Sequence, residues 1–116
     1  MNGISADLAV NKIQKLYRIE GLLNGEPTQK KYAVRQEEAR PLLNEFREWL
    51  DNAALRVSPK TKLGEAISYT LNQWEKLIRY IDDGLLSIDN NRAERAVKPF
   101  VIGRKNWLFL ASTQGV

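Results

Sequence analysis

The segment SPKTKLGEAISYTLNQWEKLIRYIDDG, residues 58–84, carries the clearest folding signal in this sequence of 116 residues. Its apolar residues recur at three- and four-residue steps, which places them on one face of an α-helix. They are Leu63, Ile67, Leu71, Trp74, Leu77, Ile78 and Ile81. Ser58 followed by Pro59 predicts a cap and a proline in the first turn, and Asp-Asp-Gly at 82–84 predicts the end. We therefore expect one long amphipathic helix here.

Two further amphipathic helices are expected before this segment. The first has a stripe made of Ile4, Leu8, Ile13, Leu16, Tyr17 and Leu23. Asn24-Gly25 with Pro27 should end it. The second covers about residues 30–55, and its inward side would hold Leu42, Leu43, Phe46, Trp49, Leu50 and Ala53. Pro41 should break or kink this helix, because proline has no amide donor and crowds the preceding turn.

The last third of the sequence changes character. Residues 85–88 are short and apolar and fit a strand or an extended connector, and Asp-Asn-Asn at 89–91 signals a helix start. A short helix over about residues 90–97 should end at Pro99, and a polar turn then leads into the apolar run 107–110. The predicted fold class is mainly α, with three long amphipathic helices, a short C-terminal helix and little strand.

Composition narrows the possible chemistry. Hydrophobic residues make up 43% of the chain, enough for one modest core. The absence of Cys and His excludes disulfides, zinc–thiolate sites, thiol nucleophiles and imidazole bases, so any chemistry must use carboxylates. No apolar run is long enough for a membrane span and no signal peptide is recognisable, so we expect a soluble, cytoplasmic protein.

Charge is distributed unevenly along the chain. Residues 1–83 are nearly balanced at +1, whereas residues 84–116 carry +3. A polyanionic partner should therefore meet the C-terminal third. The cations expected to hold nucleic-acid phosphates there are Arg92, Arg95, Lys98, Arg104 and Lys105.

The string IDNNRAERAVKPFVIGRKNWLF, residues 88–109, is the most informative stretch for function. On a helix, Asn91, Glu94 and Lys98 lie along one face. The opposite, inward side would hold Ala93, Ala96, Val97 and Phe100. One carboxylate flanked by an amide and cations suits two-metal phosphoryl transfer, because hard divalent cations prefer oxygen ligands.

The same spacing also fits a purely structural role. Asn91 to Glu94 has the spacing of a capping box, in which the glutamate satisfies an amide at the helix start and suits the helix dipole. Judged from spacing alone, the capping role is favoured, and Asp89, Asn90 and Asn91 are interpreted as cap or site support. Trp49, Trp74 and Trp107 are each interpreted as core residues rather than base-stacking platforms.

The string DNNRAERAVKPFVIGRKNWLF, residues 89–109, resembles the C-terminal signature of the transposases of the insertion-sequence sixty-six family. The segments LYRIE at 16–20, SPKTKLGEAI at 58–67 and WEKL at 74–77 resemble further segments of that family in the same order. The resemblance covers nearly the whole chain, and its C-terminal motif is the specific part. Two positions depart from the family pattern. Lys98 stands for an arginine before the proline, and Leu110-Ala111-Ser112 stands for a small residue and Gly-Ser.

The resemblance implies a DDE enzyme, in which two aspartates and a glutamate hold Mg²⁺ or Mn²⁺ while DNA is cleaved at the element's ends and joined to target DNA. Glu94 matches the catalytic, metal-binding glutamate. Such enzymes have a ribonuclease-H-like core, so residues 1–83 are expected to be a helical insertion and residues 84–116 the C-terminal catalytic segment. The two aspartates are expected upstream of Met1, so the chain alone should be inactive.

The resemblance also implies partners, and other functional classes stay open. The implied partners are DNA, the upstream transposase regions and, in the complete enzyme, a second copy. One alternative is a non-enzymatic, basic helical DNA-binding module that needs no metal. Another is a helical interaction protein whose apolar stripes mark an absent partner. Metal titration and the salt dependence of DNA binding would separate these classes.

Overall fold

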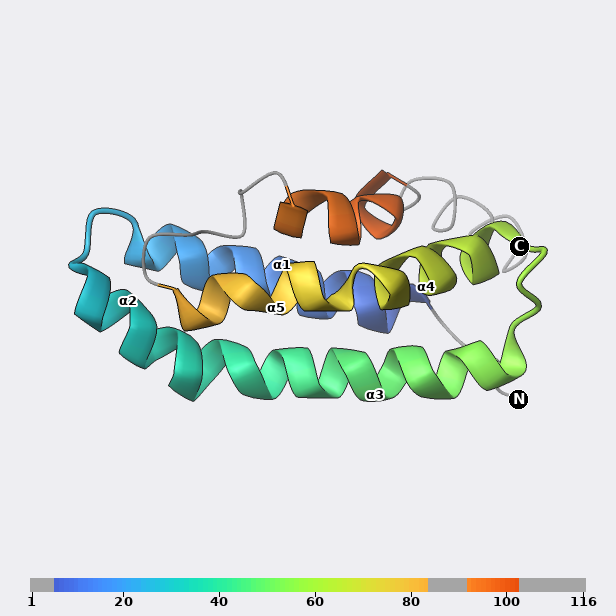
Figure 1. The fold of residues 1–116 in the computed structure, drawn as a ribbon, viewed down its shortest axis with the longest axis horizontal. Helices are drawn as coiled ribbons and strands as arrows, with labels where there is room; N and C mark the ends of the chain where they lie inside the picture. The colour runs from blue at the N-terminus through green and yellow to red at the C-terminus, as the bar shows by residue number, and fades with distance from the viewer. Residues whose placement is uncertain (1–5, 84–91, 103–116) are drawn as a thin grey trace, which may run out of the picture.

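The computed structural model describes residues 6–83 and 92–102, and every element in these two ranges is helical (Figure 1). The elements are α1 (Ala6–Leu23), α2 (Thr28–Val34), the π-helical turn η1 (Arg35–Ala39), α3 (Arg40–Arg56), α4 (Lys62–Asn72), α5 (Trp74–Asp82) and a helix over residues 92–102. The mainly α prediction is confirmed for this part of the chain. The strand or connector predicted at 85–88 and the apolar run at 107–110 lie outside the described residues. No helix in the two ranges is long and apolar enough to cross a membrane.

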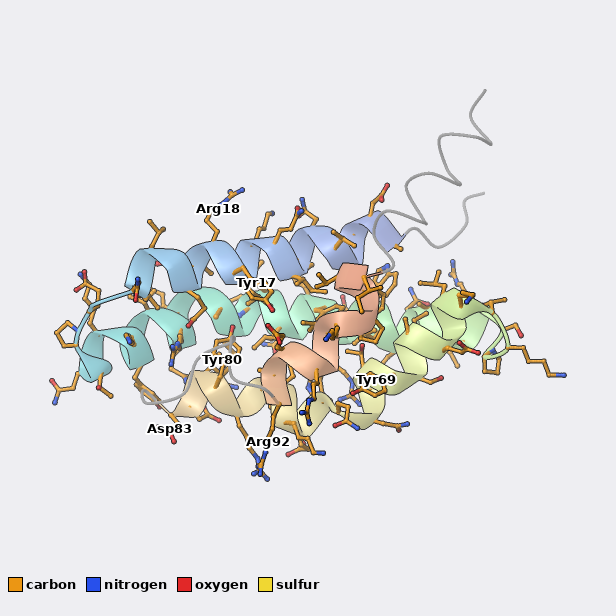
Figure 2. The ribbon with its side chains drawn as sticks, turned by 90° about the horizontal axis from the view of Figure 1, so that it is seen from above. Tyr17, Arg18, Tyr69, Tyr80, Asp83 and Arg92 are labelled. Carbon is orange, nitrogen blue, oxygen red and sulfur yellow. The ribbon has the colours of Figure 1, made fainter. Side chains whose placement is uncertain are left out.

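The helices pack side by side around one apolar core. In Figure 1, α3 forms one side of the molecule and the 92–102 helix the opposite side, with α1, α4 and α5 between them. Seen from above in Figure 2, the 92–102 helix lies between α1 and the α4–α5 pair. Every one of these helices contributes buried side chains to the core. The large side chains among them include Leu16, Leu43, Phe46, Leu50, Ile67, Trp74, Tyr80 and Phe100.

α1 follows the predicted stripe with one correction, and Ile4 of that stripe lies outside the described residues. Ile13, Leu16 and Leu23 are buried as expected, but Leu8 is 46% exposed and Ala9 is fully buried in its place. Ala9 lies one helical turn before Ile13, whereas Leu8 lies at the edge of that face. The predicted end is confirmed by Gly25, whose φ of 86° requires a residue without a side chain.

The second predicted helix forms without a break at Pro41. α2, η1 and α3 follow one another directly, and Figure 1 shows the helical run bending between α2 and α3. The amide of Arg40 donates to the carbonyl of Arg35, the five-residue step of a π-turn. Pro41 follows at the start of α3, where its missing amide leaves the wider turn undisturbed. The kink predicted for this helix is therefore confirmed.

The third predicted helix is in fact two helices, α4 and α5, and the prediction of one helix was wrong. The chain leaves α-helical geometry at Gln73, where φ is −100° and ψ is 9°. The buried positions Thr70, Trp74 and Leu77 keep a helical spacing across this residue, so periodicity does not reveal the break. The break lets α4 pack against α3 while α5 packs against η1.

The start of α4 also differs from the prediction. The cap is Thr61, whose side chain accepts a hydrogen bond of 3.0 Å from the amide of Gly64. Ser58 instead belongs to a turn, and its carbonyl oxygen accepts from the Thr61 amide at 3.1 Å. Gly64 is required at this place, because a Cβ there would lie 2.0 Å from the Ser58 carbonyl oxygen. The Ser-Pro pair therefore precedes the helix rather than capping it.

The 92–102 helix continues through Pro99, although the sequence predicted that Pro99 would end it. A proline inside a helix removes one hydrogen bond and crowds the preceding turn, at about 3 kcal/mol. Phe100, the next residue, is fully buried, and this burial offsets part of that cost. Tertiary packing thus overrides the local signal for a helix end.

Candidate functional site

One face of the 92–102 helix docks on the rest of the molecule. Its buried side chains are Ala93, Ala96, Val97 and Phe100, as the helical spacing predicted. The ring of Phe100 meets those of Phe46 and Trp49 edge-on, with centroids 5.9 Å apart in both pairs. The buried hydroxyl of Thr70 on α4 donates to the Ala96 carbonyl oxygen at 2.8 Å. These contacts fix how the helix is rotated about its own axis.

That rotation turns the charged side of the helix outward. The exposed residues with charged side chains are Arg92, Glu94, Arg95 and Lys98. Glu94 and Lys98 lie one turn apart on this side, as predicted. Within the described ranges, no hydrogen bond or ion pair engages the Glu94 carboxylate. This carboxylate is therefore exposed and has no partner within these ranges.

Several predicted site residues lie outside the described residues. They are Asp89, Asn90, Asn91, Arg104 and Lys105. The capping interpretation of Glu94 depends on the backbone amide of Asn91, which is one of these residues. Both roles for Glu94 remain predictions.

Glu94 fits one ligand position of a divalent metal site but not a complete site. An exposed carboxylate on a docked helix presents the oxygen atoms that Mg²⁺ and Mn²⁺ prefer. Across residues 6–83 and 92–102, no three acidic side chains gather into a group that could hold a metal ion. Further ligands for such an ion would have to come from outside these residues.

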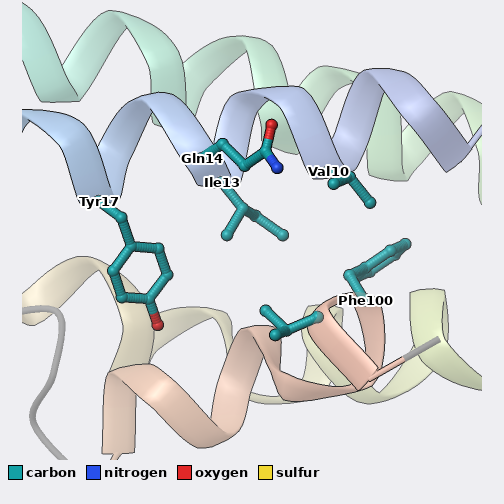
Figure 3. Close-up of a pocket in the computed structure, with 6 residues that line it drawn as sticks. Val10, Ile13, Gln14, Tyr17 and Phe100 are labelled. Carbon is teal, nitrogen blue, oxygen red and sulfur yellow. The ribbon is translucent and has the colours of Figure 1, made fainter. Parts of the chain in front are cut away.

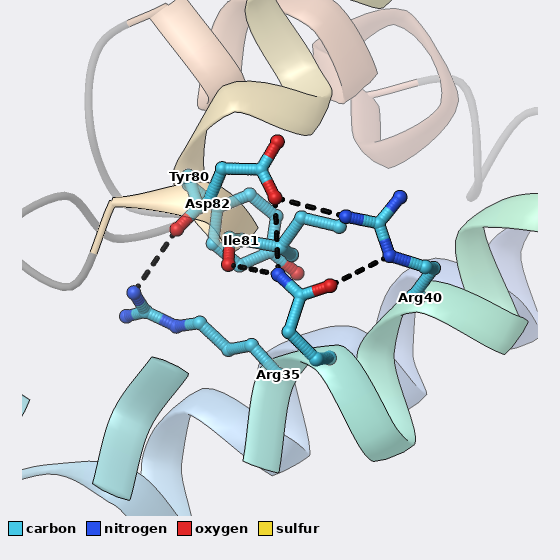
Figure 4. A network of polar contacts seen from close by, with 6 residues as sticks. Arg35, Arg40, Tyr80, Ile81 and Asp82 are labelled. Atoms are coloured by element: carbon cyan, nitrogen blue, oxygen red, sulfur yellow. Dashed lines mark hydrogen bonds and ion pairs between the residues drawn. The ribbon is translucent and has the colours of Figure 1, made fainter. Parts of the chain in front are cut away.

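A buried ion pair that the sequence analysis missed holds the end of α5. Arg35 of η1 is 1% exposed, and its Nε and Nη2 donate to the two carboxylate oxygens of Glu20 on α1 at 2.9 and 2.7 Å. Its Nη1 donates to the carbonyl oxygen of Tyr80 at 3.0 Å (Figure 4). The same Nη1 donates to the carbonyl oxygen of Asp83 at 3.2 Å. Carbonyl groups at a helix C-terminus form the negative end of the helix dipole and favour a cation there.

Two more side chains extend this contact along the last turn of α5. The Gln36 amide donates to the Ile81 carbonyl oxygen at 2.8 Å and to the Asp82 carboxylate at 3.0 Å. Arg40 donates to the Gln36 side-chain oxygen at 2.7 Å and to Asp82 at 2.9 Å (Figure 4). Together with Arg35, these residues fix the place where the chain leaves α5 toward the segment that carries Glu94.

A signal for Arg35 was present in the sequence. Counted back from the buried stripe of α3, Arg35 stands four residues before Ala39, which stands four before Leu43. A charged residue on a buried stripe is rare unless it is paired, so its position indicates a buried partner. The sequence gives no comparable signal that the partner is Glu20, which lies in another helix.

An apolar cavity of about 230 Å³ lies beside the docked helix (Figure 3). It separates part of α1 from the end of the 92–102 helix. Its lining consists of Val10, Ile13, Gln14, Tyr17, Phe100 and Val101. The packing of the 92–102 helix against α1 is therefore incomplete at this end, whereas Phe100 closes the contact with α3.

Comparison with known protein families matches residues 2–116 to the family described as "Transposase IS66 family". The chain belongs to the IS66 transposase family. Its relatives include three proteins of Sinorhizobium fredii (strain NBRC 101917 / NGR234) that are described as uncharacterized: y4hP, y4jD and y4qI. The chain is 36% identical to y4hP over 92% of its length, 30% identical to y4jD over 91%, and 34% identical to y4qI over 99%.

The IS66 chain matches only part of each relative. It spans 19% of y4hP, 21% of y4jD and 22% of y4qI. No solved structure matches it. Family membership therefore rests on sequence.

Proposed function

We propose that this chain supplies the last carboxylate, Glu94, of the active site of a DDE transposase that cleaves and joins DNA at the ends of an insertion sequence. The observation that carries the proposal is the outward face of the docked 92–102 helix. It holds one exposed carboxylate among exposed cations in an IS66 sequence. Residues 84–116 would be the catalytic segment of a ribonuclease-H-like core, and residues 1–83 its helical insertion.

In this proposal the residues of the helix have separate tasks. Glu94 holds a divalent ion, Mg²⁺ or Mn²⁺, together with two aspartates from upstream regions of the transposase. When bound, such ions activate the attacking oxygen and stabilise the charge that develops on the phosphate. Arg92, Arg95 and Lys98, with the predicted contacts Arg104 and Lys105, neutralise the DNA backbone. The docking of Phe100 fixes the distance of Glu94 from the core.

The proposed function requires partners that the chain does not contain. Its partners are element-end DNA, target DNA, the upstream transposase regions and a second copy of the complete enzyme, all in the cytoplasm. One carboxylate cannot position two metal ions, so the 116-residue chain alone should neither cleave nor join DNA. Metal-dependent nicking by the chain alone, lost in Glu94→Gln, would contradict this arrangement.

Glu94→Gln in the complete transposase tests the catalytic assignment. The substitution keeps the size of the side chain and its ability to accept a capping hydrogen bond, but a neutral amide binds a hard cation weakly. We expect strand cleavage to be lost while the melting temperature and DNA affinity are retained. Glu48→Gln, which removes an exposed carboxylate from α3, is the matched control and should cleave normally. Normal cleavage by the Glu94→Gln enzyme would make Glu94 a structural residue.

The alternative function is a basic DNA-binding module without metal chemistry. It is favoured by the exposed cations themselves, since they need no metal to contact phosphates. Arg95→Ala with Lys98→Ala should weaken DNA binding and reduce the slope of log affinity against log salt by about 1 for each lost phosphate contact. Under the alternative, Glu94→Gln would leave every measurable activity of the complete protein intact.

A further inference from the structure

A second hollow, on the α4 side of the 92–102 helix, has a chemical character different from that of the apolar cavity. Its volume is about 240 Å³. Its lining consists of Tyr69, Arg95, Lys98, Pro99 and Ile102. Figure 2 shows Tyr69 on α4 next to the 92–102 helix, and this ring is 39% exposed. One aromatic ring, two apolar side chains and two cations therefore surround a single open space.

The two cations of this hollow differ from several other cations on the described surface. Lys12, Lys30, Arg40 and Arg47 each form an ion pair with an acidic side chain. Neither Arg95 nor Lys98 has a hydrogen bond or ion pair with any residue of the described ranges. Both side chains are exposed. They are consequently available to an anion that enters the hollow.

The mixed lining limits the kinds of ligand that fit. A free phosphate would use the cations but would leave the Tyr69 ring and Ile102 without a partner. A fully paired DNA duplex presents phosphates, but its base faces are stacked and cannot reach the ring. An unpaired nucleotide offers both a phosphate and an exposed aromatic face, and aromatic rings beside basic residues are the usual means of holding such nucleotides.

We propose that this hollow binds an unpaired nucleotide of a DNA strand, with its base against Tyr69 and its phosphate paired with Arg95 or Lys98. The inference rests on the proposed function, because it names the form of DNA that meets the same helix. Glu94 precedes Arg95 and stands one helical turn, about 6 Å along the axis, before Lys98. The nucleotide would be held beside the DNA strand that is cleaved at the metal ion bound by Glu94.

The test compares two DNA probes bound to the full 116-residue chain. One is a duplex with a single unpaired 2-aminopurine nucleotide, and the other is the same duplex fully paired. We expect the unpaired probe to bind about tenfold tighter, a factor within the range that stacking on one aromatic side chain contributes. Stacking on Tyr69 should also quench the 2-aminopurine fluorescence.

Variants assign the preference to the hollow. Tyr69→Ala should reduce the ratio of the two affinities to about one, whereas Tyr69→Phe, which keeps the ring, should preserve it. Tyr32→Ala removes a ring of similar exposure, 47%, from α2 and should also preserve it. Equal binding of the two probes by the parent chain, or a preference that survives Tyr69→Ala, would overturn the inference.

The same measurements separate this inference from the proposed function. Arg95→Ala with Lys98→Ala should weaken binding of both probes, whereas Lys76→Ala, which removes an exposed cation from α5, should not. If the paired duplex still depends on Arg95 and Lys98 but no preference for the unpaired nucleotide exists, only the inference fails. If neither probe depends on these two cations, the DNA contact in the proposed function fails with it.

Discussion

Arg35 and Glu20 form a bidentate ion pair in the interior, and their side chains are only 1% and 9% exposed. The pair joins α1 to η1, and the same guanidinium lies 5.3 Å from the centre of the Tyr80 ring on α5. Three elements that are distant in sequence therefore meet at one cation. The stability of the α5 end, from which the chain leads toward Glu94, depends on this pair.

Arg35→Leu should lower the free energy of unfolding by about 3–5 kcal/mol, because it leaves the Glu20 carboxylate without its partner in a nearly buried position. Urea denaturation of the parent chain and the variant measures this loss. The double variant Arg35→Leu with Glu20→Leu should lose less than the two single variants added together. Lys30→Ala breaks the exposed pair with Glu26 and should change stability by less than about 1 kcal/mol. If Arg35→Leu and Lys30→Ala lowered the free energy of unfolding equally, the structural role of the Arg35–Glu20 pair would be contradicted.

Tyr80 should make stability sensitive to alkaline pH. Burial raises the pKa of its hydroxyl above the ordinary value of tyrosine, and the nearby Glu20 carboxylate raises it further. The unfolded chain loses this proton near pH 10, whereas the folded chain keeps it. This hydroxyl therefore leaves the free energy of unfolding constant below about pH 10 and lowers it as pH rises toward the pKa of the folded state.

Tyr80→Phe isolates this effect. No residue of the described ranges hydrogen-bonds the buried Tyr80 hydroxyl, so its removal should leave stability at pH 7 unchanged or slightly higher. Above pH 10 the free energy of unfolding should fall less steeply in Tyr80→Phe than in the parent chain. Tyr32→Phe, at an exposed position of α2, should follow the parent curve. Parallel curves for Tyr80→Phe and the parent would rule out the hydroxyl as the cause.

Gly64 and Gly21 should respond to alanine in opposite directions. At Gly64 a Cβ would lie 2.0 Å from the Ser58 carbonyl oxygen, so the backbone before α4 must move, at a cost of about 1–3 kcal/mol. At Gly21, within α1, a Cβ meets nothing within 4 Å, and alanine should stabilise the helix by up to about 1 kcal/mol. Thermal unfolding of the two variants gives the signs. A Gly64→Ala chain as stable as its parent would show that the turn yields easily.

The predictable part of the fold is the part governed by periodicity. The buried faces of α3 and of the 92–102 helix follow from apolar spacing, because one face of each meets the core along its length. The break at Gln73 does not follow, since Trp74 and Leu77 continue the spacing of α4 into α5. The prediction that Pro99 ends the last helix failed for a related reason, because the burial of Phe100 is a tertiary effect.

The sequence predicted which side of the 92–102 helix is exposed, but it did not predict the contacts that hold the neighbouring end of α5 in place. Helical spacing alone places Glu94 and Lys98 on the outward side, and the structure has them there. The role of Glu94 as ligand or cap is not decided by spacing, because both roles use the same position near a helix start. The Arg35–Glu20 pair was missed because pairing between α1 and η1 is a property of the packed molecule.

Phe100→Ala tests whether the docking of the 92–102 helix is a separate unit of stability. Phe100 is fully buried, meets Phe46 and Trp49, and borders the existing apolar cavity. Its truncation should cost about 3–5 kcal/mol, the usual value for a buried phenylalanine. The helix has few other large buried side chains, so it should detach before α1 and α3 unfold.

Hydrogen exchange measured for each segment distinguishes local detachment of the 92–102 helix from global unfolding. In Phe100→Ala, amides of residues 93–102 should lose protection while those of α3 keep most of theirs. Phe100→Leu retains an apolar side chain and should lose less amide protection. Leu55→Ala, at a position 87% exposed, should lose almost no protection. Equal loss across α3 and the 92–102 helix would mean that the two form one cooperative unit. With local loss, Glu94 would be mobile in an otherwise folded protein, and cleavage by the complete transposase should fall even though its carboxylate is intact.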